Sequence, residues 1–99
     1  MNGTRLFVVT LAVLADGDRA DLLAMASVLH RRGVDVVEAE MSRPSHGRRV
    51  FSSTFRAERH HAETVLKTFE NLIDVVDASL FEALDARAIH VDPAVTLSR

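Results

Sequence analysis

Apolar residues along the chain form four strand-like runs, separated by turns and by two helix-like runs. Residues 6–14 are almost all apolar and rich in valine, which is typical of a central strand buried on both faces. Residues 34–41 alternate loosely and residues 48–57 alternate clearly. The turn-forming segment at 42–47 between them predicts a hairpin. A further apolar run predicts a last strand over 73–81.

The first helix is predicted over 19–32 from its capping residues and its apolar spacing. Asp18 is a good N-cap. Asp21, three residues later, is the acidic residue that can complete a capping box with it. Gly33 suits the position just past the helix, and the two arginines before it complement the helix dipole. The apolar residues at helical spacing are Leu22, Met25, Ala26 and Leu29.

A second amphipathic helix is predicted over 59–72, so the elements run strand, helix, strand, strand, helix, strand. This order is that of the α+β ferredoxin-like βαββαβ sandwich. With right-handed crossovers, its antiparallel sheet has the order 4-1-3-2 and both helices cover one face. We expect one domain over 1–83 and a C-terminal tail over 84–99 that is partly ordered at best. The apolar residues of the second helix are Ala62, Val65, Leu66, Phe69 and Leu72.

The second strand lies at an edge of this predicted sheet, which leaves its outer backbone groups unpaired. Its start, Val34-Asp35-Val36-Val37, has high β propensity and no proline. Because an exposed strand of this kind invites pairing, we expect a homodimer in which two copies meet at this edge. The face of the first strand that points away from the helices also needs cover, which suits docking on a larger protein.

Composition narrows the function classes. The chain has 99 residues, 47% of them hydrophobic, which fits one globular domain with a single core. A net charge of −2 argues against a nucleic-acid partner, which needs a clustered basic face. The chain has no cysteine, so disulfides and thiolate metal sites are excluded. The sequence shows no signal peptide and no apolar run near the roughly 20 residues of a membrane span, so we expect a cytoplasmic protein that does not bind membranes.

The chain shows no motif for nucleophilic catalysis, phosphate binding or metal binding. The adjacent His60 and His61 at a helix start need not converge on one ion, so we expect solvated histidines and no metal or cofactor. One alternative is a small dimeric ferredoxin-like enzyme with a histidine base. Its candidate bases are His30, His46 and His90.

Two charged segments have both a structural and a functional interpretation. Asp16-Gly17-Asp18 is more simply a turn and a helix cap than a ligand site. The arginines around the predicted hairpin can contact an acidic partner, although a solvated loop is the simpler interpretation. These arginines are Arg43, Arg48 and Arg49.

The layout over about residues 4–82 resembles the ACT domain, a small ligand-sensing module of amino-acid metabolism. In that family the first strand ends in a turn often reading Asp-Arg-Pro-Gly before paired apolar residues. Here the turn reads Asp18-Arg19-Ala20-Asp21-Leu22-Leu23, and the second strand starts as Gly33-Val34-Asp35-Val36. Two segments also resemble the small regulatory subunit of acetolactate synthase. They are His30–Val36 and Leu66–Val76, the second of which leads from a helix into the last strand.

The resemblance implies a regulatory role without catalysis by this chain. Such subunits pair, bind and activate a large thiamine-diphosphate-dependent catalytic subunit, and often transmit feedback by branched-chain amino acids. Effectors of ACT dimers lie between the turn after the first strand of one copy and the second strand of the other. The implied effector-binding residues are Asp18, Arg19, Ala20, Asp21 and Leu22 of one copy, with Val34, Asp35 and Val36 of the second copy.

Two departures from the family pattern bear on this site. The turn lacks the proline-glycine pair, and Asp35 replaces the usual asparagine. Glycine lets a ligand approach backbone amides closely, so its loss weakens the expected site. We therefore expect free valine to bind weakly or not at all. A free-standing amino-acid sensor without a catalytic partner is a further alternative.

Overall fold

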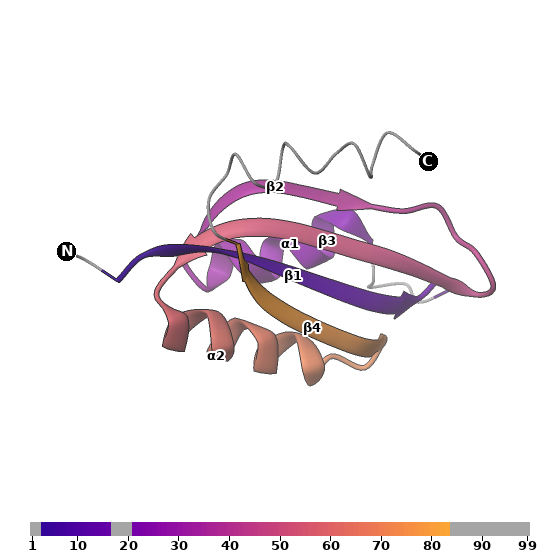
Figure 1. The fold of residues 1–99 in the computed structure, drawn as a ribbon. Helices are drawn as coiled ribbons and strands as arrows, with labels where there is room; N and C mark the ends of the chain where they lie inside the picture. Colours follow the sequence, from indigo (N-terminus) through magenta and orange to yellow (C-terminus); the bar gives the residue numbers. More distant parts are fainter. Residues whose placement is uncertain (1–2, 17–20, 84–99) are drawn as a thin grey trace.

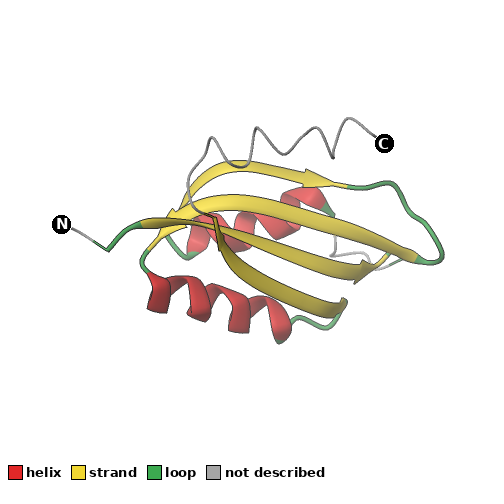
Figure 2. Cartoon of the chain, in the orientation of Figure 1, coloured by secondary structure: helices red, strands yellow, loops and turns green. Residues whose placement is uncertain are grey.

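The computed structural model describes residues 3–16 and 21–83 and folds them into one four-stranded antiparallel sheet with two helices. The strands follow the order β2-β3-β1-β4, so the predicted ferredoxin-like fold is confirmed (Figure 1). Both helices cover the same face of the sheet (Figure 2). The elements are β1 Arg5–Leu14, α1 Leu22–Arg31, β2 Asp35–Met41, β3 Arg48–Ala57, α2 Arg59–Glu70 and β4 Val75–Ala83.

The core lies between the sheet and the two helices. Alternate residues of β1 point into it and are fully buried, because side chains at every second position of a strand share one face. Helix α1 packs against β2, and α2 packs against β4 and β1. The central residues of this core are Phe7, Val9, Leu11, Val13, Met25, Leu29, Phe51, Phe55, Val65 and Phe69.

Helix α1 begins three residues later than its capping pattern predicts. Asp21 is the N-cap, and its Oδ1 accepts a hydrogen bond of 2.7 Å from the backbone N–H of Ala24. The predicted start at residue 19, with Asp18 as the cap, is therefore wrong, and Asp18 itself lies outside the described residues. The physical reason is that the apolar repeat begins at Leu22, and the residue just before it is best placed to cap.

The end of α1 is a Schellman motif, as the glycine in the sequence suggests. The backbone N–H of Gly33 donates to the carbonyl of His30 at 3.0 Å, and that of Val34 donates to the carbonyl of Leu29 at 3.4 Å. Gly33 has φ of +75°, a conformation that side chains disfavour. Val34 follows at once and is buried, so this turn directs the chain from α1 into β2.

The hairpin between β2 and β3 closes with His46 and Gly47 at its tip. Ser45 and Arg48 exchange two backbone hydrogen bonds, of 2.8 and 3.0 Å, on either side of this pair. Both tip residues have positive φ, +54° at His46 and +77° at Gly47, which is the requirement of a two-residue hairpin turn. The tip therefore lies within the predicted turn at 42–47.

Strand β2 carries an irregularity that the sequence did not predict. Its pairing with β3 shifts register between Val36 and Glu38, which is the sign of a β-bulge. The buried hydroxyl of Ser53 donates a 2.8 Å hydrogen bond to the backbone carbonyl of Glu38, just past the shift. This bond anchors the bulged edge strand to the centre of the sheet.

The second helix and the last strand are also displaced from their predicted bounds. Helix α2 ends at Glu70, and residues 71–74 form a turn in which Ile73 is 90% exposed. Strand β4 then runs over Val75–Ala83 in place of 73–81. The shift brings Glu82 into the sheet, while the predicted tail at 84–99 lies outside the described residues.

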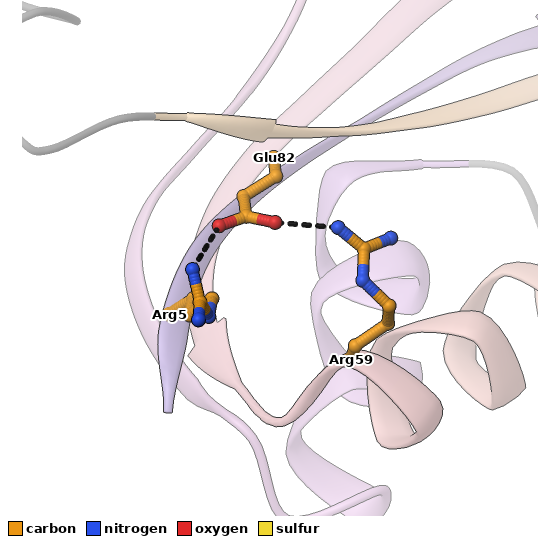
Figure 3. Close-up of polar contacts among 3 residues, drawn as sticks. All are labelled: Arg5, Arg59 and Glu82. Atoms are coloured by element: carbon orange, nitrogen blue, oxygen red, sulfur yellow. Dashed lines mark hydrogen bonds and ion pairs between the residues drawn. The ribbon is translucent and has the colours of Figure 1, made fainter. Parts of the chain in front are cut away.

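Glu82 joins three elements at one end of the sheet. Arg5 of β1 donates to one carboxylate oxygen of Glu82 at 3.1 Å, and Arg59 of α2 donates to the other (Figure 3). The Arg59 guanidinium also lies 5.5 Å from the centre of the Phe7 ring, which is cation–π distance. The end of β4 is thereby tied to the start of β1 and the start of α2.

Candidate functional site

The first half of the implied effector site is the turn that leads from β1 into α1. Asp21 is exposed here and caps the helix, and it is followed by two exposed leucines. Leu22 is 41% and Leu23 is 75% exposed, so this helix start presents apolar side chains to solvent. Asp18, Arg19 and Ala20 belong to the same implied site and lie outside the described residues.

The second half of the implied site is the start of β2, and its three residues have different environments. Val34 is buried and belongs to the core, so its side chain supports the fold. Asp35 is exposed and lies 3.5 Å from Arg56 on the neighbouring strand. Val36 is 37% exposed and pairs with Phe55, so it is the apolar residue of this half that a second molecule can reach.

One chain does not bring these two halves together. Strands β1 and β2 both pair antiparallel with β3, so they run in the same direction. Asp35 pairs with Arg56, which pairs with Leu6 near the start of β1, whereas Asp21 follows the end of β1 at Leu14. Helix α1 leads from Asp21 to the start of β2 and is about 15 Å long at 1.5 Å per residue, so the two halves lie beyond its opposite ends. A shared site therefore requires a second copy.

The cap also changes what the turn can bind. Free amides at a helix N-terminus attract the carboxylate of a ligand. The Asp21 carboxylate already accepts from the Ala24 amide, so it occupies one of these donors and places a negative charge beside the others. An amino acid approaching with its carboxylate must displace or repel this side chain. Weak binding of free valine stays the expectation, with Asp21 in the role first assigned to Asp18.

The two candidate catalytic histidines in the described part of the chain, His30 and His46, do not converge. His30 is exposed in the last turn of α1, while His46 sits at the hairpin tip, where its Nδ1 lies 3.0 Å from the Ser45 hydroxyl. These two positions lie at opposite ends of β2. His90 lies outside the described residues. His61 instead has a structural contact, because its Nε2 lies 2.7 Å from the backbone carbonyl of Arg32.

Residues 3–16 and 21–83 contain no cluster of three or more histidine and acidic side chains arranged to hold a metal ion. Neither of the two described helices is long and apolar enough to cross a membrane. A hollow of about 240 Å³ lies beside β4, and none of the described effector residues lines it. It is lined by Glu70, Val75, Val76, Asp77 and Ala78.

The polar cluster around Glu82 was missed by sequence reasoning. The last strand was predicted to stop at Phe81, so Glu82 was placed outside the sheet. No local pattern marked it, because Phe81 breaks the alternation of polar and apolar residues that runs from Asp77 to Leu80. Its two partners come from distant elements, and the sequence alone does not place them beside it.

Comparison with known proteins supports the fold. The scan against family models finds no match, and the search of curated proteins finds none either. Among solved structures, the chain is similar to the ACT domain of GTP pyrophosphokinase from Chlorobium tepidum. The TM-score is 0.69 at 7% identity, covering 84% of this chain and 92% of that one. The described fold is therefore ACT-like.

Two other structures show how widely this fold is shared. The regulatory subunit of aspartate kinase from Thermus thermophilus has a TM-score of 0.58 at 19% identity, over 81% of this chain and 55% of that one. The 30S ribosomal protein S6 from Thermotoga maritima has a TM-score of 0.64 at 9% identity, over 97% and 99% of the two chains. At these identities the likeness establishes the fold, and function has to be argued from residues.

Proposed function

We propose that this protein is a non-catalytic regulatory subunit with an ACT-like domain, which acts on a thiamine-diphosphate-dependent acetolactate synthase in branched-chain amino-acid biosynthesis. The ACT-like fold supports the regulatory part of the proposal. The resemblance of residues 30–36 and 66–76 to the small regulatory subunits of that enzyme supports the choice of partner. In the structure these segments form the passage from α1 into β2 and the passage from α2 into β4.

The observation that carries the proposal is the exposed start of α1, which follows β1 along the chain. Asp21 and two exposed leucines stand at the start of α1, on the side of the fold where the resemblance places an effector. The other half of that site lies beyond the far end of α1, a helix about 15 Å long, in the same chain. The effector site is proposed to form between two copies that pair through β2, so that pairing and ligand binding are coupled.

The test is reconstitution with the catalytic subunit from the same source. Mixing the two purified proteins is expected to give a complex by size-exclusion chromatography and a higher rate of pyruvate condensation. The same assay with and without valine measures feedback. Absence of a complex together with an unchanged rate would overturn the choice of partner.

Calorimetry on the isolated protein separates the free-standing sensor from the regulatory subunit. A panel of amino acids is titrated into the protein without any catalytic subunit. Tight binding of one amino acid, combined with no complex in the reconstitution, would identify a sensor that needs no such partner. Weak binding combined with activation is the result expected from the proposal.

A further inference from the structure

The face of the sheet that points away from the helices carries an apolar stripe along β1. The β1 residues that alternate with its core-facing side chains project from this face, and four of these five residues are apolar. No described helix covers them, because both helices lie on the other face (Figure 2). Leu6 is buried, Val8 is half-buried and Leu14 is 37% exposed. The stripe is called the open stripe, and it consists of Leu6, Val8, Thr10, Ala12 and Leu14.

The open stripe has mostly polar neighbours, which keep it narrow. Six of the nine residues that pair beside it on β3 and β4 are polar. Neighbouring strands lie about 4.8 Å apart, so the apolar surface is about one strand wide over most of its length. An extended segment fits such a stripe better than a helix, which is about 10 Å wide. The neighbours on β3 are Arg48, Val50, Ser52, Thr54 and Arg56, and those on β4 are Asp77, Ser79, Phe81 and Ala83.

The sequence after β4 has a matching pattern. Every second residue over 89–97 is apolar, and the residues between them are polar except Ala94. This alternation gives an extended segment one apolar side. The segment belongs to residues 84–99, which lie outside the described part of the chain. Its five apolar positions are Ile89, Val91, Pro93, Val95 and Leu97.

The stripe and the segment 89–97 have the same length and are joined by a short connection. Each spans eight residue steps, or about 26 Å at 3.3 Å per residue. Strand β4 ends at Ala83, which pairs with Leu6 at one end of the stripe. Residues 84–88 suffice as a connection, since loops commonly have about 2–6 residues. Because a short tether gives an effective concentration on the order of millimolar, the chain's own segment has an advantage over a second copy.

We propose that residues 89–97 dock as an extended segment along the open stripe, with their apolar side chains against β1. A fifth strand beside β4 is the other arrangement that suits an alternating segment. That arrangement leaves the stripe uncovered, and Pro93 at the centre of the segment lacks the N–H that a strand ladder uses. The docking does not depend on the proposed function, because both parts belong to this chain. A larger protein that binds this face has to displace the segment.

The test uses the full chain, which has no natural cysteine, and a single thiol introduced in the stripe by Val8→Cys. The rate of its alkylation by iodoacetamide, an uncharged reagent, measures how far the stripe is covered. Val91→Asp, Val95→Asp in this background places two charges on the apolar side of the segment. The matched control, Ala94→Asp, Thr96→Asp, places the same two charges on its other side. Unfolding curves establish that all three proteins are folded.

The expected result is alkylation at least about fivefold faster in Val91→Asp, Val95→Asp than in its parent, and less than about twofold faster in the control. Added negative charge disfavours the reactive thiolate, so charge alone does not produce this acceleration. Equal rates in all three proteins would overturn the proposal, because the segment would then lie elsewhere, as in a fifth strand. Equal acceleration in both variants would overturn the assigned side. A parent rate that rises on dilution would also overturn the proposal, by placing a second copy on the stripe.

Discussion

At the scale of single residues, Gly33 is the position where the backbone most clearly requires one residue type. Its φ of +75° is unfavourable for any side chain, yet a Cβ placed on it meets no atom within 4 Å. The cost of Gly33→Ala is therefore conformational only, and we expect a loss of about 1 kcal/mol in the free energy of unfolding. Gly33→Asn is the control and should cost less, because asparagine tolerates this region better. Equal stability of wild type and Gly33→Ala by urea unfolding would contradict the assigned backbone.

Asp21 is the residue at which helix capping and ligand binding compete. Asp21→Gly removes the carboxylate and frees the Ala24 amide, at a cost of only a few tenths of a kcal/mol of stability. Two unit charges about 4 Å apart in water repel by about 1 kcal/mol, so valine should bind the variant roughly fivefold more tightly than it binds wild type. Asp21→Ser is the matched control, because it keeps a capping oxygen without the charge. Calorimetry measures all three affinities.

The opposite result at Asp21 would assign its carboxylate to ligand binding. If wild type binds valine tightly and Asp21→Gly abolishes that binding, the carboxylate contacts the ligand, most simply through its ammonium group. The repulsion argument would then be wrong. Asp21→Ser separates the two causes, since it resembles Asp21→Gly if charge decides the affinity and resembles wild type if occupation of the amide decides it.

At the scale of elements, the bulge in β2 depends on a contact from β3. Ser53 is 1% exposed, and its hydroxyl donates to the Glu38 carbonyl at 2.8 Å. Ser53→Ala leaves that buried bond unmade, and we expect a loss of about 1–2 kcal/mol in the free energy of unfolding. The neighbouring Ser52→Ala is the control, because its hydroxyl is only half-buried and lies 3.5 Å from Thr10. Urea unfolding measures both variants. Equal losses of stability would contradict the prediction that the buried Ser53 hydrogen bond stabilises the fold more than the Ser52 hydroxyl does.

The same elements show what the sequence can and cannot predict. The valine-rich β1 was predicted because burial on both faces favours a continuous apolar run, and the helices were predicted because burial of one face imposes a repeat on the sequence. The start of α1 was missed because Asp18 and Asp21 are both good caps and only packing selects between them. The β2 bulge is held by Ser53, which lies fifteen residues after Glu38 in the sequence. Because this contact is distant in sequence, no local pattern in β2 predicts the bulge.

The candidate site was less predictable than the fold for a related reason. Asp21, Leu22 and Val36 are exposed, so a ligand can reach them, and their part in effector binding stays a prediction. Val34 belongs to the same implied site, and its side chain is buried where its backbone N–H completes the helix end, which sequence alone does not place. The Glu82 cluster combines residues 5, 59 and 82, and only the three-dimensional arrangement brings such distant positions together.

At the scale of the whole molecule, the edge proposed for pairing two copies is acidic. Glu38 and Glu40 pair with Thr54 and Ser52, so both project from the face away from the helices. In a two-fold contact along β2, that face is shared by both copies. Whether the axis passes through Glu38, Ala39 or Glu40, at least one glutamate stands directly opposite a glutamate of the second copy. Like charges placed directly opposite in this way destabilise strand pairing.

This repulsion between glutamates should make the dissociation constant of the proposed homodimer fall when salt is added or when the glutamates are replaced. Salt screens exposed charges over about 10 Å at 0.1 M, so added sodium chloride should tighten the dimer. The variant Glu38→Gln, Glu40→Gln removes the repulsion and should lower the dimer dissociation constant by up to about tenfold. Glu63→Gln, Glu70→Gln on α2 makes the same change of net charge away from the edge and should leave it unchanged. Light scattering over a dilution series, at two salt concentrations, measures all three proteins. A dimer that weakens in salt, or that responds equally to both double variants, would place the contact away from β2.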